Sequence, residues 1–209
     1  MMPIKTAVRM TAIAVGLIYA LSLLGSGIKL DTWLKQLLAL IPTLAVAAIV
    51  TFDLWVWRWP FVHRFLSRPL LLGTWKVSLT PHPDSHIPNG GNWGPIDAYL
   101  IIEQTFWTLS ATLHTAESTS RSRAARFVAR SESKAQLLTF MYENVSRREH
   151  RERSPRHIGA CEISIESRDP DRLAGEYFTD RFTAGEMQIK FCDRSTGHTD
   201  FAAALEHCR

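Results

Sequence analysis

The residues with the most evident chemistry are basic side chains that gather between Arg121 and Arg156. This stretch holds ten Lys and Arg residues against four Asp and Glu residues, in a chain of 209 residues with a formal net charge of +4. A local basic surface attracts phosphates of nucleotides, nucleic acids or lipid headgroups. It also fits a solvated loop, and both interpretations stay open. The basic residues are Arg121, Arg123, Arg126, Arg130, Lys134, Arg147, Arg148, Arg151, Arg153 and Arg156.

The arginines from Arg147 to Arg156 are the only feature that suggests a nucleic-acid partner. They lie in the segment 146–155, which has mixed charge and no aromatic residue. Proteins that bind single-stranded nucleic acids combine basic grooves with aromatic stacking platforms. We therefore expect an exposed hairpin loop and no nucleic-acid partner.

Catalytic chemistry has little support. The residues whose side chains are best suited to catalysis are His82, His86, Glu103, Glu143, Glu149 and His150. The spacing of His82 and His86 could hold a metal, but two prolines and the lack of a third ligand favour a surface loop. The chain has no glycine-rich phosphate loop before a helix, no nucleophile elbow and no HExxH motif. We expect a protein that is not an enzyme, with no catalytic residue, no cofactor and no metal.

The three cysteines, Cys161, Cys192 and Cys208, cannot all pair with one another. None of them makes a CxxC motif or a metal-like cluster with the histidines. An exported domain would more often pair its thiols. This pattern favours a cytosolic location for the part of the chain that carries them.

Two apolar runs, Met10–Ile28 and Gln36–Phe52, stand at the start of the chain and are separated only by Lys29–Lys35. Arg9 and Lys29 bracket an uncharged segment that would make about 28 Å of helix, close to the thickness of a bilayer core of about 30 Å. The spacing predicts a transmembrane helical hairpin over residues 1–60.

Aromatic and basic residues mark the ends of this predicted hairpin. They are Trp33, Trp55, Trp57 and Trp59, and Lys5, Arg9, Arg58, Arg64 and Arg68. The basic residues flank the two outer ends, so the positive-inside rule places both termini in the cytoplasm. A cleaved signal peptide ending near Gly25 is the competing interpretation, but it leaves the second apolar run unexplained.

Small residues recur every four positions in both apolar runs, at Ala12, Gly16 and Ala20 and at Thr43, Ala47 and Thr51. Such stripes let helix backbones approach closely in a membrane. They would pack the hairpin against itself, and they could also let several hairpins assemble.

After a basic connector at residues 61–70, the chain turns to short alternating strands. The predicted strands are Leu71–Leu79, Tyr99–Thr105, Trp107–His114, Ser122–Arg130, Leu137–Asn144, His157–Glu166, Arg172–Thr179 and Gly185–Cys192. Eight strands without intervening helices favour an all-β, lipocalin-like antiparallel meander barrel over residues 71–195, because closure removes exposed sheet edges. A β-sandwich is the alternative. Residues 196–209 would form a C-terminal tail.

The order of short motifs behind the predicted hairpin resembles a known family. The motifs are Leu72–Trp75, Ile102–Trp107, Thr115–Ser120, Tyr142–Asn144, His157–Gly159 and Leu173–Arg181. Together they resemble the two-transmembrane β-barrel effectors of bacterial CBASS antiphage defence, which are STING-like cyclic-dinucleotide sensors of the SMODS-associating 2TM β-strand-rich effector family.

This resemblance implies that the barrel binds a cyclic dinucleotide made by a partner nucleotidyltransferase of the cyclic GMP-AMP-synthase-like class. It further implies an inner-membrane protein that forms a homo-oligomer on ligand binding, contacts membrane lipids and disrupts the membrane, which causes abortive infection. The alternative is a membrane-anchored, lipocalin-like carrier of a small hydrophobic ligand, because lipocalins share the Gly-x-Trp opening strand.

A cyclic dinucleotide offers two bases for stacking and two phosphates for arginine or hydroxyl donors. If the barrel binds one, its stacking candidates are Trp75, Trp107, Tyr142 and Tyr177. Its phosphate candidates are Arg126 and Arg181, and its other hydrogen-bond donors are Thr105, Thr179 and His157. Each aromatic residue taken alone also fits simple core packing.

Overall fold

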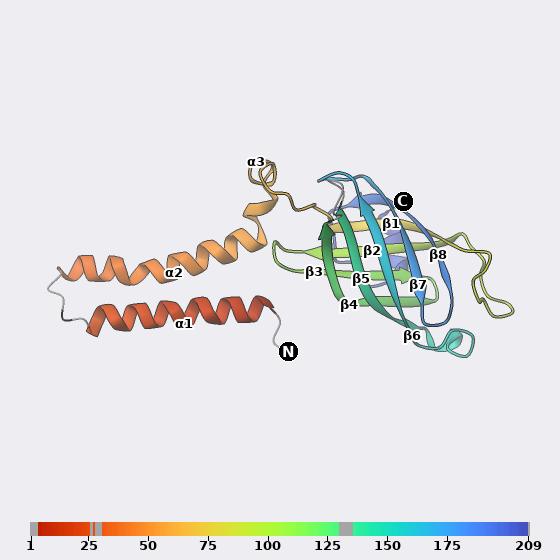
Figure 1. The fold of residues 1–209 in the computed structure, drawn as a ribbon, viewed down its shortest axis with the longest axis horizontal. Coiled ribbons are helices and arrows are strands. Elements are labelled where there is room, and N and C mark those ends of the chain that lie inside the picture. The colour runs from red at the N-terminus through yellow and green to blue at the C-terminus, as the bar shows by residue number, and fades with distance from the viewer. Residues whose placement is uncertain (1–3, 26, 28–30, 130–135, 209) are drawn as a thin grey trace. The chain divides into compact units, whose positions relative to one another are not determined.

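The protein consists of a helical unit and a β-barrel unit in a computed structural model that describes residues 4–25, 27, 31–129 and 136–208 (Figure 1). The helical unit contains residues 1–67 and 105–108, and the barrel unit contains residues 68–104 and 109–209. Arg130 and Lys134 of the basic stretch, and Lys29 of the predicted loop, lie outside the described residues.

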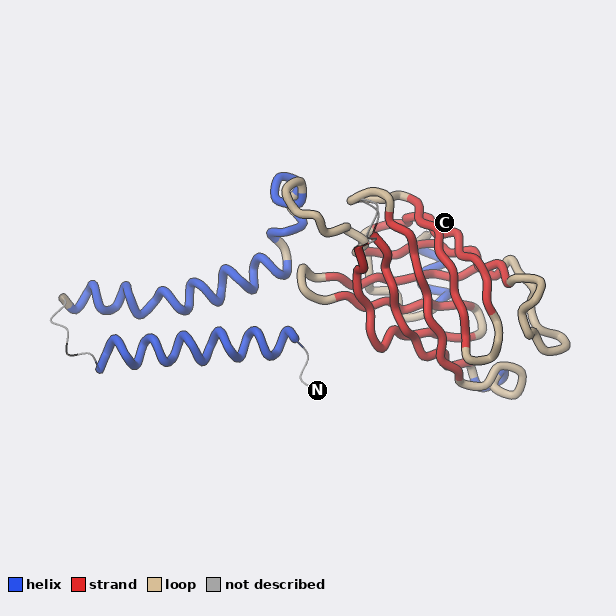
Figure 2. The backbone as a smooth tube through the Cα atoms, in the orientation of Figure 1, coloured by secondary structure: helices blue, strands red, loops and turns tan. Residues whose placement is uncertain are grey.

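The helical unit is built on two long helices, α1 (Ile4–Gly25) and α2 (Thr32–Leu54). They run side by side in opposite directions, and the short helices η1 (Val56–Arg58) and α3 (Pro60–His63) follow (Figure 2). Among the residues that the structure describes, no helix combines the length and the apolar character needed to cross a membrane.

The stripe of small residues on α1 faces α2. Ala12, Gly16 and Ala20 are less exposed than the residues on either side of them whose side chains are described. A Cβ atom added at Gly16 would lie 2.8 Å from Cβ of Pro42, which is closer than side chains approach. Gly16 therefore allows the two helices to meet at Pro42, as the small-residue pattern predicts for a close helix pair.

The stripe of small residues on α2 does not take part in this contact. Thr43, Ala47 and Thr51 are exposed, whereas Pro42, Val46 and other residues on the same side of α2 are partly buried. The two stripes therefore do not pack on each other. The second one leaves a narrow face of small side chains uncovered in the single chain.

The end of α2 is tied to residues 105–108, which belong to the same unit. Asp53 is only 3% exposed, and its Oδ1 accepts a hydrogen bond from the backbone N–H of Trp107 at 3.1 Å. Its backbone carbonyl accepts another from Phe106 N–H at 3.1 Å. Trp57 is fully buried beside Phe106, so aromatic packing completes this junction.

The barrel unit is a closed eight-stranded antiparallel barrel in which each strand pairs with its neighbours in the sequence and β1 pairs with β8. This confirms the predicted meander barrel and excludes a sandwich of two open sheets. The strands are β1 (Gly73–Pro81), β2 (Ile96–Gln104), β3 (Leu109–Thr115), β4 (Ser118–Ala129), β5 (Gln136–Ser146), β6 (His157–Ile165), β7 (Arg172–Thr179) and β8 (Ala184–Asp193).

One half of the barrel interior is filled by apolar side chains. Trp75 is fully buried there, its Nε1–H donates to the carbonyl of Leu71 at 2.9 Å, and its ring packs against Phe191. Leu138 and Ile163 are also fully buried in this core. A packed interior of this kind is typical of eight-stranded barrels.

The segment that enters β1 helps to close the filled half. Both ends of the buried Gln104 amide are used, because Oε1 accepts from Leu71 N–H and Nε2–H donates to the Pro69 carbonyl, each at 2.7 Å. The guanidinium of Arg68 lies 5.1 Å from the ring centre of Phe127. Satisfied polar groups and a covered apolar ring stabilise this end.

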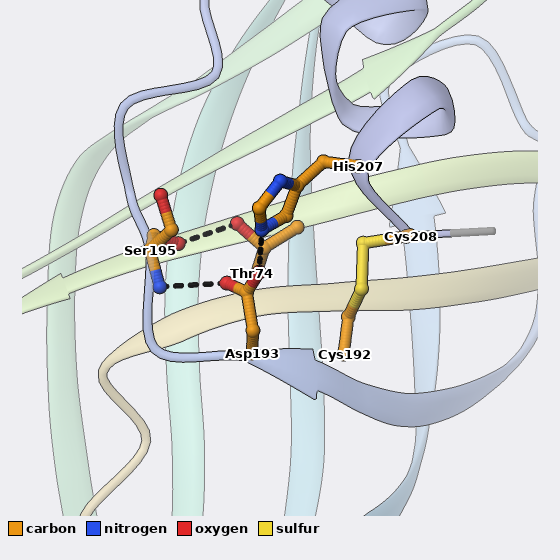
Figure 3. The surroundings of a disulfide bond; sticks show 6 residues. All are labelled: Thr74, Cys192, Asp193, Ser195, His207 and Cys208. Carbon is orange, nitrogen blue, oxygen red and sulfur yellow. Dashed lines mark hydrogen bonds and ion pairs between the residues drawn. A yellow bond between two sulfur atoms is a disulfide. The ribbon is translucent and has the colours of Figure 1, made fainter.

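A short helix lies within the predicted C-terminal tail. Residues Phe201–His207 form helix α4, which lies against β2, where the rings of Phe201 and Tyr99 are 5.4 Å apart. A disulfide joins Cys192, in β8, to Cys208, which follows α4 (Figure 3). As expected, the three cysteines do not all pair, and the buried Cys161 is free. The disulfide removes the argument for a cytosolic location that rested on the lack of paired thiols.

Candidate functional site

The second half of the barrel interior holds a cavity of about 370 Å³. All eight strands contribute to its wall, and the β1–β2 loop adds Ile87, Pro88 and Asn92. The volume lies within the range of about 300–1,000 Å³ that is usual for small-molecule sites. Because the lining runs from buried Leu100 to exposed Asn92, the cavity reaches the surface at the loop end.

The inward-facing side chains of strand β5 change from apolar to polar along the cavity wall. Phe140, Tyr142, Asn144 and Ser146 alternate with outward-facing residues, so all four point into the barrel. The first two are aromatic and the last two carry an amide and a hydroxyl. The inner wall therefore offers apolar surface deep in the barrel and hydrogen-bonding groups toward the loops.

Two tyrosines of the cavity wall each lie opposite a glycine on the neighbouring strand. Tyr142 pairs with Gly159, where an added Cβ would lie 2.4 Å from the Tyr142 hydroxyl oxygen. Tyr177 pairs with Gly185, where an added Cβ would lie 2.8 Å from the Tyr177 ring. Each glycine therefore gives the neighbouring phenol ring the room to pack closely against the strand backbone.

Two arginines stand at the loop end of the cavity. Arg153 donates to Glu117 Oε2 at 2.6 Å and to the Gly90 carbonyl at 3.2 Å. Arg181 donates to Ser154 Oγ at 3.1 Å and to the Arg153 carbonyl at 3.3 Å. Within the described part of the chain, no carboxylate lies at ion-pair distance from Arg181, so its charge is available for an anionic ligand.

An amide and hydroxyl network lines the wall nearby. Nδ2 of Asn144 donates to Oγ of both Ser118 and Ser120, at 2.9 Å each. Ser146 Oγ lies 3.5 Å from Asn144 Oδ1. These contacts hold the amide in one orientation, and hydroxyls with spare lone pairs and protons can bind the polar edges of a base.

Burial shifts the pKa values of three side chains of the cavity wall, His157, Tyr142 and Tyr177. Burial, together with the positive charge of Arg181, lowers the pKa of His157, whose Nδ1 lies 3.0 Å from the Pro155 carbonyl. Burial raises the pKa of Tyr177 to about 12 and raises that of Tyr142 further. Both phenols therefore keep their proton and can act as hydrogen-bond donors.

The structure brings five of the nine predicted ligand residues together in this cavity. They are Tyr142, His157, Tyr177, Thr179 and Arg181. The other four lie elsewhere. Trp75 is part of the filled core, and Thr105 and Trp107 belong to the helical unit, where Trp107 is tied to Asp53.

Arg126 is the fourth residue, and a β-bulge accounts for its position. Ser118 and Ser120 face inward on β4, so strict alternation predicts an inward Arg126. The pairing of β4 with β5 shifts between Ser122 and Ala124, and after this point Ala125 and Phe127 pack on the core. Arg126 therefore lies on the outer face and is exposed.

Sequence analysis missed several residues of the wall, among them Phe140, Asn144, Ser120 and Arg153. Phe140 and Asn144 could have been predicted from the sequence, because both alternate along β5 on the same face as Tyr142. Arg153 was interpreted as part of an exposed loop. The fold of the loop residues 147–156 turns it back to Glu117 and the Gly90 carbonyl, a contact between segments far apart in the sequence.

Comparison with known proteins agrees with this geometry. The model of the family described as "Cap15, cyclic dinucleotide receptor domain" matches residues 66–190, which is more than half of the chain. No curated protein gives a significant match. The matched residues contain seven complete strands of the barrel and every residue that lines the cavity except Phe201, in α4. The chain therefore belongs to the family of Cap15 cyclic dinucleotide receptors.

Proposed function

We propose that the cavity described above is the cyclic dinucleotide site of this receptor. The observation that carries the proposal is the joint presence, on one cavity wall, of two phenol rings and of Arg181, which has no carboxylate partner among the described residues. A cyclic dinucleotide needs both kinds of group, because it presents flat bases and two phosphate charges.

In this proposal, Arg181 and Arg153 bind phosphate oxygens at the loop end, and the hydroxyl of Thr179 assists them. Thr179 Oγ1 lies 2.6 Å from Thr183 Oγ1 and accepts from Arg181 N–H, so it is already part of the same cluster. Tyr142 and Tyr177 stack with the bases, and the Asn144 network binds base edges. The base specificity depends on that network.

The carrier of a hydrophobic ligand is the weaker candidate. It would require an uncharged lumen, whereas the cavity contains two arginines and the carboxylate of Glu117. An apolar ligand would leave these groups desolvated without compensation, which costs free energy.

We also propose that the helical unit attaches the receptor to the bacterial inner membrane, with both termini in the cytoplasm. Large apolar side chains such as Ile18, Leu21 and Leu44 are more than 60% exposed on α1 and α2, which supports burial in lipid. Ligand binding would then drive assembly of the helical units into a homo-oligomer that disrupts the membrane. The ligand would come from a partner nucleotidyltransferase, and the protein itself would not be an enzyme or need a cofactor.

Ligand binding to the purified full chain in detergent micelles tests the site. Melting temperature and calorimetry with a panel of cyclic dinucleotides should identify at least one that binds. Arg181→Gln should weaken that ligand by at least about tenfold, because a hydrogen bond to a charged group contributes about 1.5–3 kcal/mol.

Arg126→Gln is the matched control, because it removes the same charge from the outer face of the same barrel. It should change the affinity by less than about twofold, as surface substitutions usually do. The proposal fails if no cyclic dinucleotide binds, or if the two variants lose affinity equally.

A further inference from the structure

Three metal-ligating side chains meet beside α4, outside the cavity. Asp193, at the end of β8, His198, in the following loop, and His207, at the end of α4, each bring one ligand atom into a group whose members lie within 4.8 Å of one another. The family match ends at residue 190, so this cluster lies beyond the matched residues.

Hydrogen bonds of the surrounding chain orient Asp193. Asp193 Oδ1 accepts from Ser195 N–H at 2.6 Å, and this leaves Oδ2 directed at Nε2 of His207 (Figure 3). Oγ1 of Thr74 donates to the Ser195 carbonyl at 2.6 Å, which fixes the turn on β1. Such outer hydrogen bonds orient the ligands of metal sites.

The two ends of the cluster are joined covalently. Cys192 and Cys208 are the sequence neighbours of Asp193 and His207, and their disulfide brings the end of β8 to the end of α4 (Figure 3). The N-terminus of α4 is fixed independently, because Asp200 caps it by accepting from Ala203 N–H at 2.9 Å. The position of His207 is therefore set from both sides.

His198 supplies the observation that points to a missing partner. Its Nε2 atom is buried and has no hydrogen-bond partner among the described residues. Its ring lies 4.7 Å from that of His207, centre to centre. A buried ring nitrogen without a partner is costly, and a cation shared with the neighbouring imidazole and carboxylate would satisfy it.

Arg194, the neighbour of Asp193 in the sequence, does not form an ion pair with the Asp193 carboxylate. Arg194 pairs with Asp169, donates to the Leu72 carbonyl at 2.9 Å and lies over the ring of Phe191. Its charge is therefore directed away from Asp193. Two imidazoles and one carboxylate remain, a ligand set suited to Zn²⁺ and related transition metals rather than to Mg²⁺ or Ca²⁺.

We propose that Asp193, His198 and His207 form a binding site for a divalent transition metal of the Zn²⁺ type. A tetrahedral ion with bonds of about 2.1 Å separates its ligand atoms by about 3.4 Å, so small side-chain rotations bring the three atoms into place. The fourth position is open to water. The metal ties α4 to the end of β8, next to the disulfide.

Zn²⁺ titration of the oxidised full chain in detergent, against a competing chelator, tests the proposal. We expect one tightly bound Zn²⁺ per chain and a visible d–d spectrum of tetrahedral type when Co²⁺ replaces it. His198→Ala, His207→Ala and Asp193→Asn should each weaken binding by at least about tenfold, since even an outer-shell partner of a metal ligand is worth that much.

His86→Ala is the control, because His86 is an exposed histidine in the β1–β2 loop and should not affect Zn²⁺ affinity. Asp193→Asn keeps the oxygen that accepts from Ser195, so it separates loss of a ligand from loss of the turn. The proposal is wrong if the wild-type chain binds no stoichiometric Zn²⁺, or if the three ligand variants bind as tightly as the His86 control. Neither outcome depends on cyclic dinucleotide binding.

Discussion

At the scale of single residues, the cavity depends on the pairing of large rings with glycines. Gly159 faces Tyr142, and Gly185 faces Tyr177, so the neighbouring backbone forms the surface on which each ring rests. A ring confined in this way loses little further freedom when a base stacks on it. The glycines are thus as important to the site as the tyrosines.

Gly159→Ala tests this arrangement. The new methyl group would overlap the Tyr142 ring, so we expect a loss of about 1–3 kcal/mol in the free energy of unfolding, typical of an overpacked core, together with weaker ligand binding. Gly197→Ala is the control, because no atom lies within 4 Å of a Cβ atom there. Chemical denaturation of both variants measures the difference, and equal stabilities would contradict the proposed role of Gly159.

A second prediction concerns His114, which is only 3% exposed and lies 3.1 Å from Thr119 Oγ1. Burial and the charge of Arg121 lower its pKa below the ordinary 6.5, against the opposing effect of Asp200. The unfolded chain therefore binds a proton at a higher pH than the folded chain. The stability present above pH 6.5 must fall as the pH decreases below that value.

Denaturation midpoints measured over a pH series check this expectation. His114→Asn should flatten the decrease on the acid side, although not remove it, because burial also lowers the pKa of His157. A variant with an unchanged pH profile would show that the charge on His114 has no part in acid stability.

At the scale of elements, the two small-residue stripes have different surroundings. Gly16 on α1 contacts Pro42, whereas Ala47 on α2 is exposed. Two stripes with the same four-residue spacing therefore differ in their surroundings: the one on α1 packs within the helix pair, and the one on α2 is uncovered. The difference arises because only one side of α2 can face α1.

Gly16→Val should weaken the helix pair, because its side chain would overlap Pro42, where even a Cβ atom comes to 2.8 Å. We expect a cost of about 1–3 kcal/mol, seen as a lower midpoint for thermal loss of the helical circular dichroism signal in micelles. Ala47→Val adds comparable bulk on the exposed face and should leave the midpoint unchanged. The contact is unimportant if both variants melt together.

At the scale of the whole molecule, the barrel divides its interior between stability and recognition. The half that contains Trp75 and Leu138 is packed, and the half that contains Tyr142 and Arg181 holds the cavity. A fully packed barrel would bind nothing, and a fully open one would lose the apolar burial that stabilises a domain of this size.

Ala47→Asp tests whether the exposed face of α2 acts in the proposed membrane damage. A charge within a bilayer costs about 2.5–3.5 kcal/mol on insertion scales, so the variant should abolish dye uptake in cells that produce the activating dinucleotide. Its affinity for the ligand should equal that of the wild type, because Ala47 lies outside the barrel unit. Persisting damage would mean that the helices serve only as a tether.

The sequence was sufficient for features that repeat along the chain. Alternation within each strand predicted eight strands and their closure, because inward and outward positions differ in polarity wherever one face is buried. The strands are thus a consequence of local pattern. Tyr142, Tyr177 and Arg181 were grouped instead by the chemistry of the ligand that the family resemblance implies.

Only the tertiary structure decided what depends on contacts between distant segments. The bulge after Ser122 turns Arg126 outward, and the packed half of the barrel takes Trp75 away from the cavity. The disulfide between Cys192 and Cys208 forms because α4 folds back on the barrel. Neither the bulge nor this return of the chain has a periodic signal, since each results from packing over the whole domain.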